Sequence, residues 1–185
     1  LRQPLEGGTV TVSRSAHSVT FPADCMLVGA MNPCGCGYYP DKNKCACTPG
    51  DIRRHLRKVS RPLLDRMDMS VEVPRVKMSE LTGSGENENS QAIRSRVEKA
   101  VELQERRYGQ ENFRYNSRIP ADKIETYCPM EPGARKQIAR AYEQLNLSAR
   151  AYHRLIRVAR TIADLSESDL ISESHMREAL LYRTM

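Results

Sequence analysis

The stretch LSARAYHRLIRVARTIADL, residues 147–165, has the clearest periodicity in the chain. Its apolar side chains recur three or four positions apart, which is the spacing of one helical face; they are Ala151, Leu155, Val158 and Ile162. Ser148 precedes the pattern and is a good N-cap, because its hydroxyl can accept a hydrogen bond from a first-turn N–H. The stretch therefore predicts a helix with one apolar stripe, beside a parallel stripe of arginines: Arg150, Arg154 and Arg157.

The flanking sequence also has helical patterns. Helices are predicted at about 90–107, 120–127, 132–145, 149–164 and 173–183. Ahead of them, residues 79–90 read SELTGSGENENS and are rich in Gly, Ser and Asn, a composition typical of loops. We therefore expect a linker at 79–90 and an all-helical domain at 91–185.

Residues 1–78 have the pattern of a small α/β region. TVTV and SVTF flank SRSAHS, which predicts a β-hairpin over 9–21. The continuous apolar run CMLVGAM (25–31) is typical of a strand buried on both faces, and a second strand is expected over about 69–73. A helix is predicted to begin after Thr48, and RPLLDR to form a short one. A hairpin and two strands do not complete a layered sheet, so we expect 1–78 to be part of a larger α/β domain.

The composition is that of a soluble globular protein, since the 185 residues are 39% hydrophobic and 28% charged. No apolar run approaches the roughly 18 residues of a membrane span, and the N-terminal LRQPLEGG lacks the pattern of a secretion signal. A cytoplasmic protein with no membrane partner is therefore expected. The net charge of +6 permits a polyanionic partner without requiring one. Basic residues gather within 42–66 and 150–160, as solvated faces or as binding surfaces.

Four cysteines lie in the stretch AMNPCGCGYYPDKNKCACTP (30–49), as two C-x-C pairs: Cys34, Cys36, Cys45 and Cys47. Four thiolates in one short loop can surround a zinc ion in a closed tetrahedral site, which would be structural because it leaves no open position. The usual spacing is C-x-x-C, so reduced thiols remain an alternative. Disulfides are a third, disfavoured by the expected reducing compartment.

Three segments together resemble one family: residues 1–41, PLLDRMDMSVEVP (62–74) and LSARAYHRLIRVARTIADL (147–165). The family is the magnesium-chelatase-like AAA+ ATPases of the ComM/YifB type, bacterial proteins linked to DNA uptake and recombination. The resemblance implies the second half of an AAA+ ATPase core followed by a helical lid. The chain contains no G-x-x-x-x-G-K-[ST] phosphate loop and no Walker B strand. It is therefore expected to bind ATP and Mg²⁺ only with an upstream half, and to be inactive alone.

The resemblance assigns nucleotide-sensing roles to three positions. Asn32 falls at the first sensor, where a short polar side chain can orient the attacking water; alternatively, Asn32-Pro33 only starts a turn. Arg66 in LLDRMD matches the arginine finger that acts on the neighbouring subunit's nucleotide, with Arg61 as the second choice. A local ion pair of Arg66 with Asp65 or Asp68 is the competing interpretation. Arg150 in LSAR matches the second sensor, with Arg154 as its alternative.

The hairpin corresponds to the one that precedes the first sensor in the family and lines the central channel in helicase relatives. Arg14 and His17 near its tip are therefore candidate DNA contacts, or else the residues of an exposed basic turn. Together these features predict a ring-forming ATPase, expected to be a hexamer, that remodels or translocates DNA in a helicase or branch-migration reaction. Two alternatives stay open: a motor that drives metal insertion by a chelatase partner, and a binding module without turnover.

Overall fold

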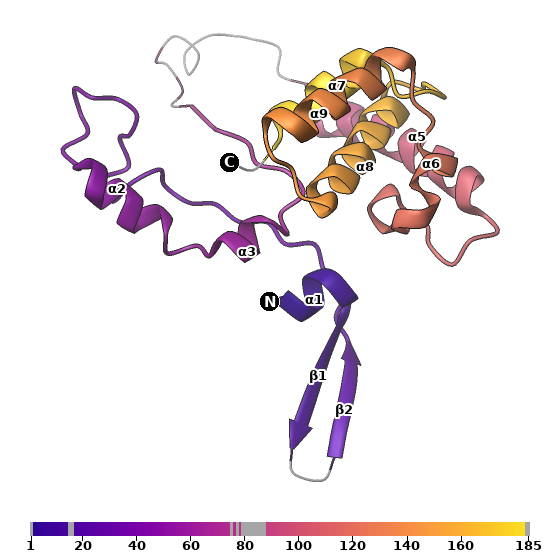
Figure 1. Ribbon diagram of the computed structural model, residues 1–185, viewed down its shortest axis with the longest axis horizontal. Helices are drawn as coiled ribbons and strands as arrows, with labels where there is room; N and C mark the ends of the chain where they lie inside the picture. Colours follow the sequence, from indigo (N-terminus) through magenta and orange to yellow (C-terminus); the bar gives the residue numbers. More distant parts are fainter. Residues whose placement is uncertain (1, 15–16, 75, 77, 79–87, 184–185) are drawn as a thin grey trace. The chain divides into compact units, whose positions relative to one another are not determined.

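The computed structural model describes residues 2–14, 17–74, 76, 78 and 88–183 of the chain. It has two compact units, of which the first ends at Met67 and the second runs from Asp68 to Arg183 (Figure 1). The predicted linker at 79–90 lies mostly outside the described residues, and its last residue, Ser90, begins a helix. No helix in the described part of the chain is both long and apolar enough to cross a membrane.

The first unit begins with a short helix and the predicted hairpin. Helix α1 (Arg2–Gly7), which the sequence patterns did not predict, leads into strands β1 (Thr9–Arg14) and β2 (His17–Pro22). The strands pair antiparallel from Thr9 opposite Pro22 to Arg14 opposite His17. Gly8 has a φ of 61°, a conformation that glycine adopts without the steric cost of a side chain. The hairpin prediction is confirmed.

Two further helices complete the first unit. Helix α2 (Pro49–Leu56) has Thr48 as N-cap, in a capping box in which Thr48 and Asp51 exchange hydrogen bonds. Pro49 occupies the first helical position, where its missing N–H removes no hydrogen bond. Helix α3 (Arg61–Leu64) follows as one short turn. Both helices were predicted from these signals.

The two further predicted strands are wrong for the described chain. Residues 25–31 form neither a strand nor a buried segment, since Met26 is 89% exposed and Val28 81% exposed. Residues 69–73 likewise belong to no strand. The physical reason is that a buried strand needs neighbours to bond its N–H and C=O groups. Among the described residues, β1 and β2 pair with each other and with no third strand.

From Ser90 onward the second unit is helical, as predicted for residues 91–185. It comprises α5 (Ser90–Tyr108), the 3₁₀ turns η1 (Asn116–Arg118) and η2 (Ala121–Lys123), α6 (Ile124–Tyr127), α7 (Pro132–Gln144), α8 (Ala149–Leu165) and α9 (Glu173–Leu181). Ser148 caps α8 by accepting a hydrogen bond from the Ala151 N–H. Each predicted helix is present, with ends shifted by no more than a few residues.

Helix α8 lies at the centre of this unit and packs against α9, α5 and α6 (Figure 1). Leu155 is buried as predicted, while Ala151, Val158 and Ile162 pack against the core and stay partly exposed. The helix is more enclosed than one apolar stripe implies, because three further side chains are fully buried: Ile156, Ala159 and Ala163. The core therefore surrounds α8 on more than one side.

The arginines of α8 are not one solvated face. Arg160 is completely buried, so it belongs neither to a solvated face nor to a binding surface, the two interpretations of the basic residues at 150–160. Its Nε donates to Asp164 at 3.1 Å, and its Nη1 donates to the carbonyl of Asp169 at 2.7 Å. Arg107 donates to the same Asp164 carboxylate at 3.0 and 2.5 Å. These charges belong to the interior of the second unit, because buried ions are stable only when paired and hydrogen-bonded.

Candidate metal centre and nucleotide-sensing residues

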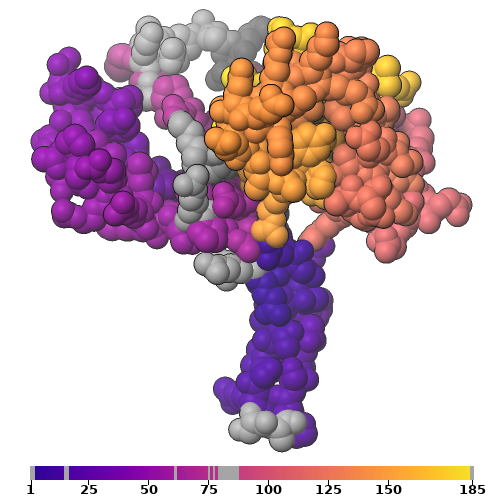
Figure 2. Space-filling view, viewed as in Figure 1, coloured from indigo at the N-terminus to yellow at the C-terminus, as the bar shows by residue number. Residues whose placement is uncertain are grey.

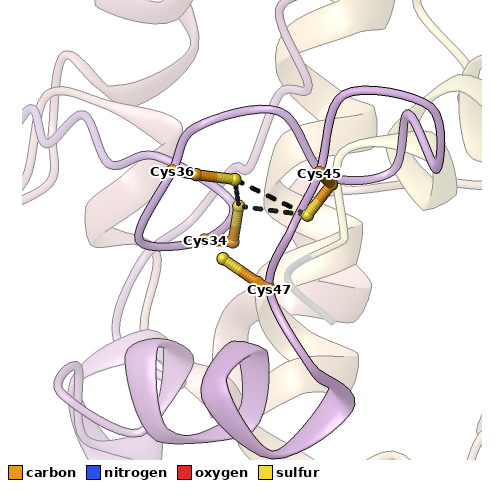
Figure 3. A group of neighbouring side chains, drawn as sticks. All are labelled: Cys34, Cys36, Cys45 and Cys47. Carbon is orange, nitrogen blue, oxygen red and sulfur yellow. Dashed lines mark hydrogen bonds between the residues drawn. The ribbon is translucent and has the colours of Figure 1, made fainter.

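The four predicted cysteines gather at one point. Their sulfur atoms all lie within 4.8 Å of one another and point toward a common centre (Figure 3). Cys34 Sγ lies 3.4 Å from Cys36 Sγ and 3.8 Å from Cys45 Sγ, and Cys36 Sγ lies 3.6 Å from Cys45 Sγ. A tetrahedron with zinc–sulfur bonds of about 2.3 Å has edges of about 3.8 Å. The sulfur positions therefore fit a tetrahedral Zn²⁺ site.

Tight turns bring the two C-x-C pairs together. The first pair sits in a turn closed by the Gly37 N–H, which donates to the Cys34 carbonyl at 3.2 Å, and Gly37 has a φ of 81°. The second pair follows a turn in which the Asp41 carbonyl accepts from the Cys45 N–H at 2.8 Å. Cys47 directly precedes the N-cap of α2. A glycine at positive φ and a capped helix thus hold the loop in its shape.

The protonation of the thiols also suits a cation. Burial raises the pKa of Cys34, but hydrogen bonds from the Tyr39 N–H and the neighbouring thiols outweigh it and lower the pKa to about 6. The N–H of Cys47 lowers the pKa of Cys45, but burial, hydrogen bonds to Cys36 and Cys34 and the charge of Cys34 raise it to about 12. Thiolates this close repel one another, so once Cys34 is deprotonated it costs more free energy to deprotonate its neighbours. A bound dication removes that repulsion.

All six cysteines are free thiols. The sulfurs of the cluster stand well beyond the roughly 2.0 Å of a disulfide bond, so the disulfide alternative has no support in the structure. Cys25 is exposed and lies apart from the cluster, and burial raises the pKa of Cys128 to about 11. Neither cysteine belongs to the group of four sulfurs.

Asn32 lies at the base of the cysteine loop. It is exposed and does not end a strand, because 25–31 is not one. Its main-chain carbonyl accepts a hydrogen bond from His55 Nε2 at 2.9 Å. A carbonyl oxygen can only accept, so Nε2 of His55 carries the proton. His55 belongs to the last turn of α2. Its hydrogen bond therefore connects the end of this helix to Asn32, at the start of the cysteine loop.

Arg66 makes a local ion pair with a partner that the sequence did not suggest. Its Nη2 lies 2.8 Å from Glu6 Oε1 in α1, and its Nη1 donates to the Pro62 carbonyl. The side chain is largely buried, at 14% exposed. The competing interpretation expected a local ion pair of Arg66 with Asp65 or Asp68, whereas the partner in the structure is Glu6. No sequence signal links Glu6 to Arg66, because they lie sixty positions apart in separate elements.

The two candidates for the second sensor differ in exposure. Arg150 lies in the first turn of α8 and is exposed, whereas Arg154 is buried at 8% exposed. The third helix arginine, Arg157, donates to the Ile119 carbonyl at 2.5 Å, and burial lowers its pKa. Arg150 is the residue of this series that solvent reaches most freely.

The hairpin carries its candidate DNA residues at the last described pair of the ladder, where Arg14 faces His17. Both side chains are exposed, and the strands present nearly all their side chains to solvent (Figure 2). Alternation along the strands puts Val12, Val19 and Phe21 on the face of Arg14 and His17. The opposite face has hydroxyl pairs, such as Thr11 with Thr20 at 3.0 Å. The tip residues 15–16 lie outside the described residues.

Comparison with known proteins shows which family the chain belongs to. Residues 1–81 match the family model "Magnesium chelatase, subunit ChlI", and residues 87–183 match "Magnesium chelatase, subunit ChlI C-terminal". The chain belongs to the magnesium chelatase ChlI family. The first match ends at residue 81 and the second begins at residue 87, within the polar stretch at 79–90.

Within the ChlI family, the chain is similar to relatives of the ComM/YifB type. It is 40% identical over 186 residues to the competence protein ComM of Haemophilus influenzae, and 37% identical to the protein YifB of Salmonella typhimurium. It is 31% identical over 183 residues to Rv2897c of Mycobacterium tuberculosis. Each match covers 99% or more of this chain but 36% of the relative. The chain thus spans about a third of the length of these relatives.

Proposed function

We propose that the full-length protein is an AAA+ ATPase that assembles into a ring, expected to be a hexamer, and moves DNA strands. The observation that carries this proposal is the match of both parts of the chain to the ChlI family, with a relative named a competence protein. In this account the chain supplies sensing residues, and ATP with Mg²⁺ is bound together with the rest of the protein. The cluster of free thiols is suited to a reducing compartment such as the cytoplasm.

Three residues would act on the nucleotide. Asn32 would orient the attacking water, and Arg150, exposed in the first turn of α8, would contact the phosphates from the lid of its own subunit. Arg66 would act from the neighbouring subunit, where its planar guanidinium can stabilise charge spread over the transferring phosphoryl oxygens. To do so, Arg66 must exchange Glu6 for phosphate oxygens. The ion pair with Glu6 holds the guanidinium ready between turnovers.

The hairpin would contact the DNA. Arg14 and His17 are exposed side by side at its tip end, and a basic group in that place can bind phosphate without reading sequence. Such contacts release counterions from the DNA, so their number sets the salt dependence of binding.

The test replaces Arg14 with Ala in the full-length protein. We expect DNA binding to weaken about equally for unrelated sequences, and the slope of log K against log salt to shrink by about one unit for each phosphate that Arg14 binds. ATP hydrolysis without DNA should be nearly unchanged. Ser13→Ala, one residue before Arg14 on the hydroxyl face, is the matched control and should leave the slope unchanged. An unchanged slope for Arg14→Ala would show that another surface holds the DNA.

The name of the family favours a second function, a motor that drives metal insertion by a chelatase partner. The two functions differ in what stimulates hydrolysis. Stimulation of the full-length ATPase by DNA supports the proposed function, whereas stimulation only by a protein partner supports the chelatase motor. Absence of any turnover would identify a binding module.

A further inference from the structure

The cysteine loop and Asn32 are joined by contacts at both ends of the loop. At the first end, Asn32 lies two residues before Cys34, and a Cβ added at Gly37 would lie 3.9 Å from the Asn32 amide nitrogen. The Asn32 side chain therefore lies beside the turn that carries the first pair of cysteines. At the other end, His55 reaches the main-chain carbonyl of the same residue.

Helix α2 connects the second pair of cysteines to His55. It begins one residue after the Thr48 N-cap, which itself directly follows Cys47. The Thr48 hydroxyl donates to the Asp51 carboxylate at 2.6 Å, and this hydrogen bond lowers the pKa of Asp51. The eight-residue helix is a rod about 12 Å long. Because α2 begins two residues after Cys47, we expect a movement of that cysteine to be passed along the helix to His55.

We propose that the metal loop is a positioning device for Asn32, with His55 as the residue that transmits the position. A metal held by the four cysteines fixes Cys47 and hence the start of α2. The helix places His55, whose Nε2–H···O=C hydrogen bond then holds the Asn32 main chain. The inference rests on the proposed function insofar as Asn32 acts on nucleotide.

This positioning role would explain why a closed structural metal site lies next to Asn32, the proposed first sensor. Small displacements of a group that orients a reactant slow a reaction strongly, by up to about a hundredfold for 1 Å. The hydrogen bond to Asn32 is solvent-exposed, and an exposed hydrogen bond alone holds weakly because water competes for both groups. If a metal-bound loop fixes the donor in place, forming this hydrogen bond costs less conformational entropy.

The test uses the zinc-loaded full-length protein with His55→Ala, His55→Gln and, as matched control, Arg54→Ala. Arg54 is adjacent on the same helix, and its side chain is 81% exposed. We expect His55→Ala to lower kcat about 10- to 100-fold with little change in KM for ATP, while zinc content stays at the wild-type level. His55→Gln keeps an N–H donor and should recover part of the loss. Arg54→Ala should match wild type in all three quantities.

A second readout does not depend on catalysis. Hydrogen exchange of a peptide spanning residues 26–36 should be faster in His55→Ala than in wild type, and removal of zinc with a chelator should speed it in wild type equally. The two changes together should add little to either alone, because they act on one connection. Unchanged exchange in His55→Ala would overturn the proposal whatever Asn32 does.

Asn32→Ala separates this inference from the proposed function. If Asn32→Ala keeps full kcat, the sensor role is wrong, and the exchange measurement alone decides the positioning role. If Asn32→Ala lowers kcat and His55→Ala does not, the sensor role stands and the positioning role is overturned.

Discussion

At the scale of single residues, contacts between distant positions were the least predictable. Asn32, Arg66 and Arg150 are candidates because of the resemblance, which says nothing of their surroundings. Nothing in the sequence pairs Glu6 with Arg66 or His55 with Asn32, because such contacts depend on how separate elements pack. Arg160 and Asp164 are different, since they stand four positions apart on one helix, a spacing that brings side chains together.

Asp164 is the residue whose loss should destabilise the second unit most clearly. Its carboxylate is fully buried and accepts hydrogen bonds from Arg107, Arg160 and the Asn116 amide. Asp164→Asn leaves buried cations without their counter-charge, and we expect it to lower the free energy of unfolding by about 3–5 kcal/mol. Glu102→Gln is the control, because its ion pair with Arg106 is exposed and contributes less than about 1 kcal/mol. Urea unfolding checks both; equal effects would contradict the assignment.

Glu111 should make the free energy of unfolding of the second unit depend on pH in the acidic range. Hydrogen bonds from Lys123 and the Tyr127 hydroxyl, each at 2.5 Å, hold the pKa of Glu111 below its usual value. A lowered pKa in the folded state contributes stability above the unfolded pKa of about 4.3, which is lost as the pH falls through the folded value. Glu111→Gln should therefore be less stable than wild type at pH 7. Denaturant unfolding should show this difference shrinking below about pH 4, and a constant difference would be the contrary result.

At the scale of elements, local signals predicted the helices and the hairpin. Ser148 and Thr48 cap helices as expected, because capping depends on groups within one turn. The strands at 25–31 and 69–73 could not be predicted in the same way. An apolar run becomes a strand only when neighbouring strands bond to it, and the described chain offers none.

The cysteine loop is the element with the most direct chemical test. Three of its sulfur–sulfur distances are close to the edge length of a zinc–thiolate tetrahedron, and all four sulfurs lie within 4.8 Å of one another. We expect about one zinc ion per chain after purification without chelator, measured by elemental analysis. Cys36→Ser should lose most of this metal, whereas Cys25→Ser, outside the cluster, should keep it. Four titratable thiols without metal in the wild-type loop would show that the cluster is reduced and metal-free.

At the scale of the whole molecule, the order of an α/β region followed by helices was predictable, and so was an incomplete sheet, whereas the sequence wrongly added two strands to the hairpin. The described strands make one hairpin only, and the chain spans 36% of its ComM relative. In the proposed function, the nucleotide site would be built from two subunits and would include parts of the protein outside this chain. The role of Arg66 therefore can be judged only in the assembled protein.

Mixing subunits tests the central claim that the protein is a nucleotide-hydrolysing ring with Arg66 acting in trans. One full-length chain carries Arg66→Ala, and the other carries a substitution of the phosphate-loop lysine expected upstream. Each variant chain alone should assemble into rings and hydrolyse almost no ATP. Together they should recover measurable turnover, because some interfaces then combine an intact phosphate loop with an intact Arg66. If every mixing ratio stays inactive although mixed rings form, Arg66 serves its own subunit through Glu6 and the claim is contradicted.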